Sequence, residues 1–313
     1  MEIHRSLEPV QPAGGCALAL GYFDGLHQGH RAVIAAAKAW AEANGAQPAV
    51  FTFALPAESR IKGRRLLSTR EKHRRAAEIG VTHYFAPPFE EIRDQSPQQF
   101  VDRILVGCCG ARAVFCGEDF TFGKDRAGNV PLLRRLCAER GIRVEVVPYA
   151  CYEGQRVSST RIRAALEEGQ VELANAMLGE DYCLDGAVHH GTGRGHVWGF
   201  PTVNQLFAPG QMIPRQGVYI TRVELADGSF WPGATGLGSR PTVGGEGITC
   251  ETFLPGFTGD IYGDEIRVWF CHYLKPTVRF DSVDQLKEYV FSAARSAEDY
   301  FRQHPEALNA KTR

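Results

Sequence analysis

Short apolar runs alternate with helical stretches through the first half of the chain. Four runs have the length and composition of buried strands, at residues 16–20, 49–53, 113–116 and 144–147. Three helices are predicted between them, at residues 28–44, 69–79 and 131–140. This alternation predicts an α/β, Rossmann-like domain, in which a parallel sheet has helices on both faces and binds ligands at the carboxyl ends of its strands.

The pattern changes near residue 181. From residue 182 to residue 277 the chain is rich in glycine and turn residues, with short strand-like runs at 217–223 and 266–270. The dipeptide Asp227-Gly228 between two such runs is a hairpin signal. This second pattern predicts an antiparallel β-barrel or sandwich.

A last helix is predicted at residues 281–301, where Asp281 or Ser282 is suited to be the N-cap. We therefore divide the chain into an α/β domain of residues 1–180 and a β-barrel domain of residues 181–313. The second domain ends in the C-terminal helix.

Composition limits the possible partners and the location. The 313 residues carry a formal net charge of -1, so the totals do not indicate a surface that coats nucleic acid or a membrane. No apolar run approaches the roughly 18 residues of a membrane span. No apolar segment follows the first residues, as a secretory signal would require. We expect a cytoplasmic protein without nucleic-acid or membrane partners.

The chain has nine cysteines, an odd number for a framework of disulfides. None forms a Cys-x-x-Cys pair, and the adjacent Cys108 and Cys109 do not have the spacing of zinc ligands. We expect reduced and mostly buried thiols.

Residues 21–30 have the composition of a loop that handles phosphate groups. They follow a predicted strand and open a predicted helix, whose first N–H groups favour anions. His27 and His30 lie on one face of the first turn, where two imidazoles can donate hydrogen bonds to phosphate oxygens. The alternative is that the histidines only cap the helix, but the strand–loop–helix context favours phosphate binding.

Residues 157–163 form a second candidate for anion binding. Ser159 or Thr160 can cap the helix predicted at residues 164–168. Their hydroxyls, the amides of the helix end and the side chains of Arg161 and Arg163 together suit an anion. The alternative is an ordinary cap with solvated arginines.

The second domain contains a glycine-rich loop and a candidate base. Thr202 and Asn204 follow the loop and are hard oxygen donors that suit Mg²⁺. Glu251 is an acid in an apolar strand-like run, where it could accept the proton of an attacking hydroxyl. The alternatives are a flexible hairpin loop and an outward-facing strand residue. The glycines of the loop are Gly191, Gly193 and Gly195.

Three motifs of the first domain resemble the FMN adenylyltransferase half of bacterial bifunctional riboflavin kinase/FAD synthetases. They are Gly-x-Phe-Asp-Gly-x-His-x-Gly-His at 21–30, Gly-Glu-Asp-Phe-Thr-Phe-Gly at 117–123 and Ser-Ser-Thr-x-Ile-Arg at 158–163. The resemblance implies that His27 and His30 stabilise the phosphates of ATP. It also implies that further residues hold the nucleotide, namely Gly21, Phe23, Asp24, Ser159, Thr160 and Arg161. It associates the pocket for flavin and nucleotide with Asp119, Phe120 and Phe122.

One segment departs from this family. The family usually carries Thr-Phe-Asp-Pro-His-Pro after its second strand, whereas residues 52–57 of this chain read Thr-Phe-Ala-Leu-Pro-Ala. The acidic residue and the histidine are both missing. A riboflavin kinase with a degenerate adenylyltransferase domain is therefore an alternative.

The second domain resembles the riboflavin kinase module in motif content and order. The matching motifs are the glycine-rich loop, Gly-Phe-Pro-Thr-x-Asn at 199–204, residues 238–243, the strand with Glu251 and residues 260–263. The resemblance implies that Gly191, Gly193 and Gly195 bind the nucleotide. It also implies that Thr202 and Asn204 hold Mg²⁺-ATP and that Glu251 is the general base toward the ribityl 5′-hydroxyl.

The resemblance covers nearly the whole chain and implies a bifunctional enzyme. We expect ATP-dependent phosphorylation of riboflavin to FMN in the second domain and adenylylation of FMN to FAD, with release of pyrophosphate, in the first. The expected partners are riboflavin, FMN, FAD and ATP with Mg²⁺, and the expected state is a monomer or weak homo-oligomer. A flavin-binding regulator without turnover is disfavoured by Glu251, and a nucleotidyltransferase for another substrate is disfavoured by the kinase module.

Overall fold

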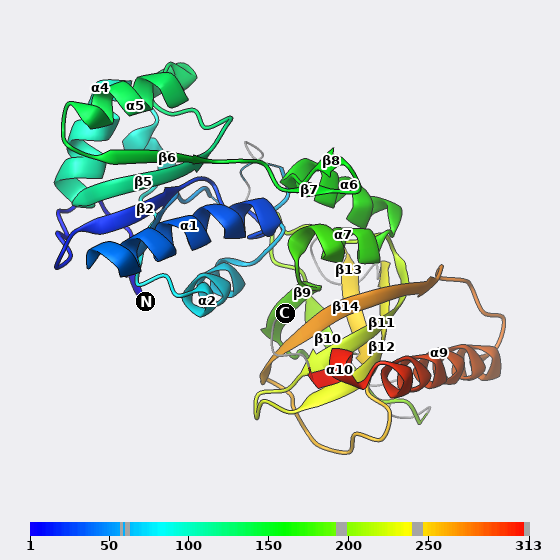
Figure 1. The fold of residues 1–313 in the computed structure, drawn as a ribbon. Coiled ribbons are helices and arrows are strands. Elements are labelled where there is room, and N and C mark those ends of the chain that lie inside the picture. The colour runs from blue at the N-terminus through cyan, green and yellow to red at the C-terminus, as the bar shows by residue number, and fades with distance from the viewer. Residues whose placement is uncertain (57–58, 60–62, 192–198, 240–246, 310–313) are drawn as a thin grey trace. The chain divides into compact units, whose positions relative to one another are not determined.

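The chain forms two compact units in a computed structural model that describes residues 1–56, 59, 63–191, 199–239 and 247–309. The first unit contains Met1–Gly63 and Thr69–Ser158, and the second contains Arg64–Ser68 and Ser159–Arg313 (Figure 1). Residues 159–180, which the sequence analysis assigned to the first domain, form part of the second unit. The ranges 1–180 and 181–313 stay a prediction for the limits of the two activities.

The first unit is built on a six-stranded parallel sheet with strand order β1-β4-β3-β2-β5-β6. Its strands are β1 (Glu2–His4), β2 (Cys16–Leu20), β3 (Gln47–Phe51), β4 (His83–Phe85), β5 (Ala111–Gly117) and β6 (Arg143–Val147). Every residue of β2 is buried, as expected for an apolar run at the centre of a sheet covered on both faces. The predicted parallel α/β domain is confirmed.

Helices cover both faces of this sheet. Cys16, Leu18 and Leu20 pack with η1 and α5 in one core cluster, while Ala17 and Ala19 point to the other face of β2, on which α1 packs. The elements are α1 (Gln28–Asn44), α2 (Thr69–Ile79), α3 (Phe89–Ile92), α4 (Pro97–Gln99), the π-helix η1 (Phe100–Cys108), the 3₁₀-helix η2 (Lys124–Arg126) and α5 (Val130–Ala138). A short hairpin follows, of β7 (Cys151–Tyr152) and β8 (Gln155–Arg156).

Local signals set the ends of α1. His27 is its N-cap and accepts the backbone N–H of His30, and Gly45 ends it in the left-handed conformation at φ 63°. Val33, Ile34, Ala37 and Ala41 form its buried face, at helical spacing. The predicted bounds of α1 and α2 agree with the structure.

The second unit is built on a curled antiparallel sheet of six strands, in the order β10-β13-β12-β11-β14-β9. The strands are β9 (Tyr182–Ala187), β10 (Thr202–Leu206), β11 (Gly217–Glu224), β12 (Phe230–Ser239), β13 (Ile248–Phe253) and β14 (Glu265–Lys275). A bridge between His189 and Asn204 connects the two ends of this order, so that the sheet forms a half-barrel. The predicted hairpin at Asp227-Gly228 is confirmed, because Glu224 on β11 pairs with Phe230 on β12.

The helices that the structure describes in the second unit are α6 (Ser159–Glu168), α7 (Val171–Leu178), α9 (Val283–Gln303) and α10 (Pro305–Asn309). Ser282 is the N-cap of α9, as one of the two predicted candidates, and its hydroxyl accepts the N–H of Gln285. Ala293 and Ala294 of α9 pack in one core cluster with residues of β11, β12 and β13. The predicted C-terminal helix on an antiparallel β domain is thereby confirmed.

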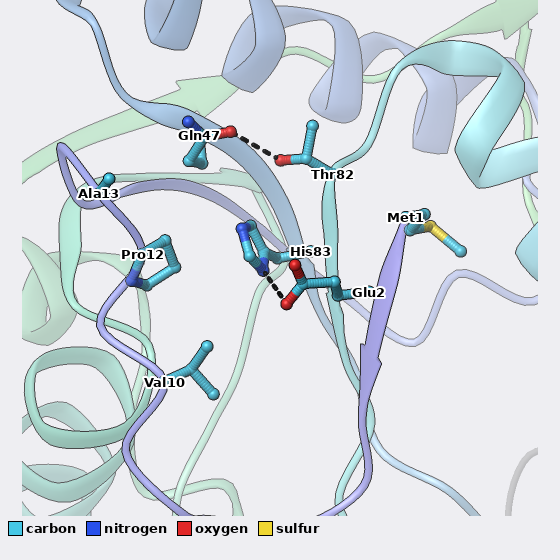
Figure 2. A pocket seen from close by; sticks show the side chains of 8 residues that line it. All are labelled: Met1, Glu2, Val10, Pro12, Ala13, Gln47, Thr82 and His83. Carbon is cyan, nitrogen blue, oxygen red and sulfur yellow. Dashed lines mark hydrogen bonds and ion pairs between the residues drawn. The ribbon is translucent and has the colours of Figure 1, made fainter.

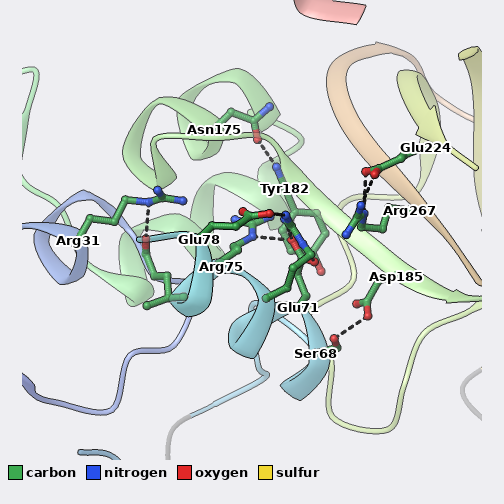
Figure 3. A network of polar contacts seen from close by, with 12 residues as sticks. Arg31, Ser68, Glu71, Arg75, Glu78, Asn175, Tyr182, Asp185, Glu224 and Arg267 are labelled. Carbon is green, nitrogen blue, oxygen red and sulfur yellow. Dashed lines mark hydrogen bonds and ion pairs between the residues drawn. The ribbon is translucent and has the colours of Figure 1, made fainter. Parts of the chain in front are cut away.

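A short piece of the first half of the chain belongs to the second unit. The backbone N–H of Arg65 donates to the carbonyl of Gly210, and that of Met212 donates to the carbonyl of Arg65, both at 2.8 Å. The Ser68 hydroxyl donates to the carboxylate of Asp185 at 2.8 Å (Figure 3). These hydrogen bonds make Arg64–Ser68 part of the half-barrel unit, which no sequence pattern indicated.

All nine cysteines are free thiols, and all except Cys151 are buried. The prediction of reduced, mostly buried thiols is confirmed. Among the described helices, none combines the length and apolar character that crossing a membrane requires.

Candidate active sites

The first candidate site is the loop that joins β2 to α1. Gly21 follows the last residue of β2, and its N–H donates to the carbonyl of Phe51 at 3.2 Å. Phe23 and Leu26 have φ angles of 53° and 46°, which are unfavourable for residues with a side chain. Both side chains are buried, and this burial holds the loop in its tight path. Asp24, between them, is also buried.

His27 and His30 lie together at the start of α1, as predicted. Their rings stack with centroids 3.6 Å apart and planes 15° apart. His27 Nδ1 accepts the N–H of His30 at 3.3 Å, so this nitrogen carries no proton and the proton of a neutral His27 is on Nε2. His27 Nε2 is therefore a hydrogen-bond donor at a helix N-terminus, which is the arrangement that favours an anion.

The surroundings keep His30 neutral. Burial lowers the pKa of His30 well below its usual value, and the neighbouring His27 and Lys72 lower it further. Its Nδ1 is buried and has no hydrogen-bond partner among the described residues. An anion bound beside this ring would offset the repulsion between positive charges that now opposes protonation.

Lys72 is a residue of this site that the sequence analysis did not single out. Its ammonium lies 5.1 Å from the centre of the Tyr22 ring, and its charge contributes to the lowered pKa of His30. Lys72 comes from the middle of the polar helix α2, and no motif in the sequence connects that helix to the loop at 21–30. A cation here adds to the attraction for phosphate.

The segment that departs from the family lies after β3. The Thr52 hydroxyl donates to the carbonyl of Tyr22 at 3.0 Å, so the segment contacts the loop of the first site. The backbone of Ala54 is held in place, since its N–H donates to Pro87 and its carbonyl accepts from Phe89, both at 2.9 Å. Ala54 therefore differs from the acid of the motif in its side chain, while its backbone is held by hydrogen bonds. Ala57, the last residue of the segment, lies outside the described residues.

The segment 117–123 brings two aromatic rings together. Phe120 and Phe122 stack with centroids 5.8 Å apart, and the backbone of Phe122 exchanges two hydrogen bonds with Gly128. Asp119 is exposed and forms an ion pair with Arg156 at 2.6 Å. The segment thus presents a half-buried aromatic ring next to an exposed carboxylate.

The motif Ser-Ser-Thr-x-Ile-Arg lies at the start of α6. The helix begins at Ser159, five residues earlier than the predicted start at Ala164, so Ser159 and Thr160 lie in its first turn. Ser159, Thr160 and Arg161 belong to the second compact unit, whereas His27 belongs to the first. A nucleotide site shared by these residues stays a prediction.

The second candidate site lies on the half-barrel, where β10 and β13 pair. Asn204 stands directly opposite Glu251, and Thr202 stands opposite Phe253. Opposite residues of an antiparallel pair share a face of the sheet, as do residues two apart on one strand. The structure therefore brings Thr202, Asn204 and Glu251 to one face. Thr202 and Asn204 lie in strand β10, so the alternative of a flexible hairpin loop does not hold for these two residues.

Close packing surrounds the Asn204 amide. Its Nδ2 donates to the carbonyl of Thr202 at 3.2 Å, and only 8% of the residue is exposed. A Cβ atom at Gly191 would lie 2.6 Å from Nδ2, so this first glycine of the loop is needed for the approach. Gly193 and Gly195 lie outside the described residues. Asn204 Oδ1 accepts no hydrogen bond from the described residues, which leaves a hard oxygen that fits Mg²⁺.

The Glu251 carboxylate is held on the same face. It is half-buried, and its Oε1 accepts a hydrogen bond from the Thr249 hydroxyl at 3.2 Å. Thr252, the next residue, points to the opposite face, and its Oγ1 lies 2.7 Å from Oγ1 of Thr235 on β12. This buried contact holds β13 against β12, on the face opposite to the one on which Glu251 lies.

Fold and sites together define a class of protein. In sequence order, an α/β unit with two stacked histidines at the start of α1 precedes a half-barrel in which Asn204 stands opposite Glu251. Residues 10–161 match the family model of FAD synthetase, and residues 178–301 match the family model of riboflavin kinase. The class is therefore that of enzymes that combine these two domains in one chain.

The similar proteins identify the family. A bifunctional riboflavin kinase/FMN adenylyltransferase of Pseudomonas fluorescens is 35% identical and aligns over 92% of this chain and 94% of its own length. Proteins of the same description from Haemophilus influenzae and Bacillus subtilis are each 32% identical, over 92% and 91% of this chain. The chain belongs to the family of bifunctional riboflavin kinase/FMN adenylyltransferases.

A solved structure supports the fold over nearly the whole length. The crystal structure of a Streptococcus pneumoniae protein described as a macrolide-efflux protein matches with a TM-score of 0.85 and 26% identity. The match covers 95% of this chain and 98% of that one. The order of an α/β unit and an antiparallel half-barrel is thus shared with an experimental structure.

Proposed function

We propose that this chain converts riboflavin to FMN on the half-barrel and FMN to FAD in the α/β unit, with ATP as the co-substrate of both reactions. The observation that carries the proposal is the placement of Asn204 opposite Glu251, with Gly191 packed against the amide. An oxygen donor for a nucleotide-bound metal and a carboxylate base on one face are what phosphoryl transfer to a hydroxyl requires.

In the kinase reaction, the Glu251 carboxylate accepts the proton of the ribityl 5′-hydroxyl as that oxygen attacks the γ-phosphorus of ATP. The P–O bond to ADP breaks as the bond to the flavin oxygen forms. Thr202 and Asn204 would hold Mg²⁺, which when bound neutralises charge on the phosphates. Gly191, Gly193 and Gly195 would lie along the nucleotide. The Thr249 hydroxyl positions Glu251 through its hydrogen bond at 3.2 Å.

In the adenylyl transfer, an oxygen of the FMN phosphate attacks the α-phosphorus of ATP and pyrophosphate leaves. This step needs no protein nucleophile. His27 Nε2 donates a hydrogen bond to a phosphate oxygen, and the neutral His30 lies stacked beside it. Developing negative charge is stabilised by these imidazoles and by the start of α1.

The remaining residues of the adenylyltransferase would bind and orient the substrates. Phe120 provides aromatic surface for a flat ring and is stacked on the buried Phe122, and Asp119 provides an acceptor beside it. The loop after β2 would hold the ATP phosphates. The residues assigned to this nucleotide are Gly21, Phe23, Asp24, Ser159, Thr160 and Arg161.

A second candidate function is riboflavin kinase activity alone. The observation in its favour is Ala54, which stands at an ordered position where the family usually has an acid. The observation against it is the stacked pair of His27 and His30 at the start of α1. If the aspartate that Ala54 replaces contributes to metal or phosphate placement, adenylyl transfer will be slow relative to the kinase reaction.

The test is a time course of purified protein with riboflavin, ATP and Mg²⁺, with the flavins separated by chromatography. FMN that appears first and is then consumed to FAD supports the bifunctional assignment. FMN that accumulates without FAD, including when FMN is supplied directly, supports the kinase alone. Absence of both products would overturn the proposal in favour of a flavin-binding protein.

The substrates are small molecules in aqueous solution, so the proposed reactions involve neither nucleic acid nor a membrane. We place the activity in the cytoplasm, carried out by a monomer or weak homo-oligomer. Sedimentation of the purified chain over a range of concentrations tests the oligomeric state, and fractionation of cells that produce it tests the location.

A further inference from the structure

Glu2, His4 and His83 form a cluster of metal-ligating side chains at the edge of the parallel sheet. Strands β1 and β4 pair in parallel, with Glu2 opposite His83, and His4 lies two residues further along β1 on the same face. His4 Nε2 lies 3.0 Å from His83 Nδ1. Glu2 Oε2 lies 3.9 Å from the first nitrogen and 3.7 Å from the second.

We propose that these three side chains bind a divalent transition metal ion, for which Zn²⁺ is the best match. The three distances define a triangle with a central point about 2.1 Å from every ligand atom, and bonds of Zn²⁺ to imidazole nitrogen and carboxylate oxygen are about 2.0–2.2 Å. Two imidazoles and one carboxylate suit zinc and its neighbours in the first transition row, whereas Mg²⁺ and Ca²⁺ prefer oxygen ligands.

The two imidazoles are fixed before any ion binds. The His4 ring stacks on Phe85, which is fully buried, with centroids 4.6 Å apart. The side chains of His4 and His83 are only 15% and 12% exposed, whereas that of Glu2 is 71% exposed. Rigid imidazoles with an adjustable carboxylate form a site that can close around an ion at little cost in reorganisation.

A cavity beside the cluster leaves room for a further ligand of the ion. It has a volume of about 530 Å³ and is lined by Glu2 and His83 together with Gln47, Thr82 and apolar side chains (Figure 2). Metal sites with three protein ligands complete their coordination with water or a small molecule, which this cavity can admit.

The cluster is separate from the nucleotide site of the same unit. His83 pairs with Ala49 of β3, which in turn pairs with Leu18 of β2, so the cluster lies beside the sheet at the edge strand β1 and not at the loop that follows β2. His27 follows β2, and strands β3 and β4 lie between β2 and β1, so three strand spacings of about 4.8 Å separate β1 from β2 across the sheet. Binding at this cluster is therefore expected to leave the phosphate-handling loop unaltered.

The experiment is a titration of the full chain, without a polyhistidine tag or nucleotide, with Co²⁺ as a spectroscopic probe for the zinc site. We expect one equivalent to bind with visible d–d absorption, and Zn²⁺ but not Mg²⁺ to displace it. Glu2→Gln and His83→Gln should each weaken binding by at least about tenfold, since loss of even an outer partner of a metal ligand costs 10- to 100-fold. Zn²⁺ should raise the melting temperature of the unsubstituted chain and not that of these variants.

Two control variants keep the test specific. His304→Gln removes an exposed imidazole elsewhere, and Cys151→Ser removes the exposed thiol, so neither should change the titration. Glu2→Gln should fold normally because its side chain is exposed, and it should make FMN and FAD at unchanged rates. The proposal is overturned if Co²⁺ does not saturate one site, if Glu2→Gln and His83→Gln bind as tightly as the unsubstituted chain, or if only Cys151→Ser loses binding.

Discussion

Asn204 and Glu251 stand opposite one another on the antiparallel strands β10 and β13, 47 positions apart in the sequence. The two residues stand directly opposite one another only in this register. A slip by one residue would turn one of them to the other side of the sheet. On the other side of β13, a buried hydroxyl contact between Thr252 and Thr235 holds this strand against β12.

Replacing Glu251 with Gln should reduce riboflavin kinase turnover by about 10²- to 10⁴-fold, because the amide cannot accept the proton of the attacking hydroxyl. FMN formation by the purified variant measures this. FAD formation from supplied FMN should be unchanged, since that reaction does not use the half-barrel. Glu288→Gln, an exposed change on α9, is the matched control. Kinase turnover near that of the control would rule out the base.

Replacing Gly191 with Ala should raise the KM of the kinase for ATP by about tenfold or more. The new Cβ would lie 2.6 Å from Asn204 Nδ2, so the amide must move, and a displacement of about 1 Å can cost 10²-fold in rate. Gly186→Ala is the control, because its Cβ would meet its nearest neighbour, Gln205, at 3.9 Å. Steady-state kinetics at varied ATP concentration measure the KM for ATP of both variants. Equal KM values for Gly191→Ala and Gly186→Ala would show that the position of the Asn204 amide is unimportant.

The features that the sequence predicted correctly depend on signals within single segments. The ends of α1 depend on the cap at His27 and on Gly45, which are local signals, and the predicted bounds agree with the structure. The β2 run is apolar throughout because both of its faces are covered, and this too is visible in a single segment. The prediction of the fold class rested on segments of this kind.

Relationships between distant segments could not be predicted in this way. The opposition of Asn204 and Glu251 depends on strand register, and the cluster of Glu2 and His83 depends on a pairing of β1 with β4 across about eighty residues. Arg64–Ser68 joins the half-barrel unit through backbone hydrogen bonds that leave no compositional signal. The start of α6 at Ser159 was missed because serine and threonine have only a modest helical propensity. Packing in the folded protein can override this propensity.

Replacing His27 and His30 together with Ala should abolish FAD synthesis and leave FMN synthesis intact. The change removes the stacked pair and the N-cap of α1, so loss of a helix cap, about 1 kcal/mol, is expected alongside the loss of function. His27→Asn is the informative comparison, because asparagine keeps a capping side chain but has no imidazole Nε2. Chromatographic assay of FAD from FMN separates the cases: full activity in His27→Asn would leave His27 with a capping role only.

Glu71 supports the first unit through a buried ion pair in α2. Its Oε1 accepts the Nε–H of Arg75 at 2.6 Å, and both side chains are almost fully buried (Figure 3). Burial opposes ionisation of Glu71, but the hydrogen bonds from Arg74 and the charge of Arg75 prevail and lower its pKa below 4.5. The carboxylate is therefore charged in the folded protein at neutral pH.

Replacing Glu71 with Gln should reduce the free energy of unfolding of the first unit at neutral pH by about 3–5 kcal/mol, because it leaves the buried guanidinium of Arg75 without this carboxylate. The folded pKa of Glu71 lies below its ordinary value of 4.5, so the folded state binds fewer protons than the unfolded state in this window. The contribution is thus present above about pH 4.5 and is lost as the pH falls through the folded pKa. Denaturant unfolding at neutral and acidic pH measures the difference, which should shrink on acidification. Glu78→Gln, whose side chain is 44% exposed beside Arg74, should change stability by only about 0–1 kcal/mol, and a Glu71→Gln effect that is equally small or independent of pH would contradict the assignment.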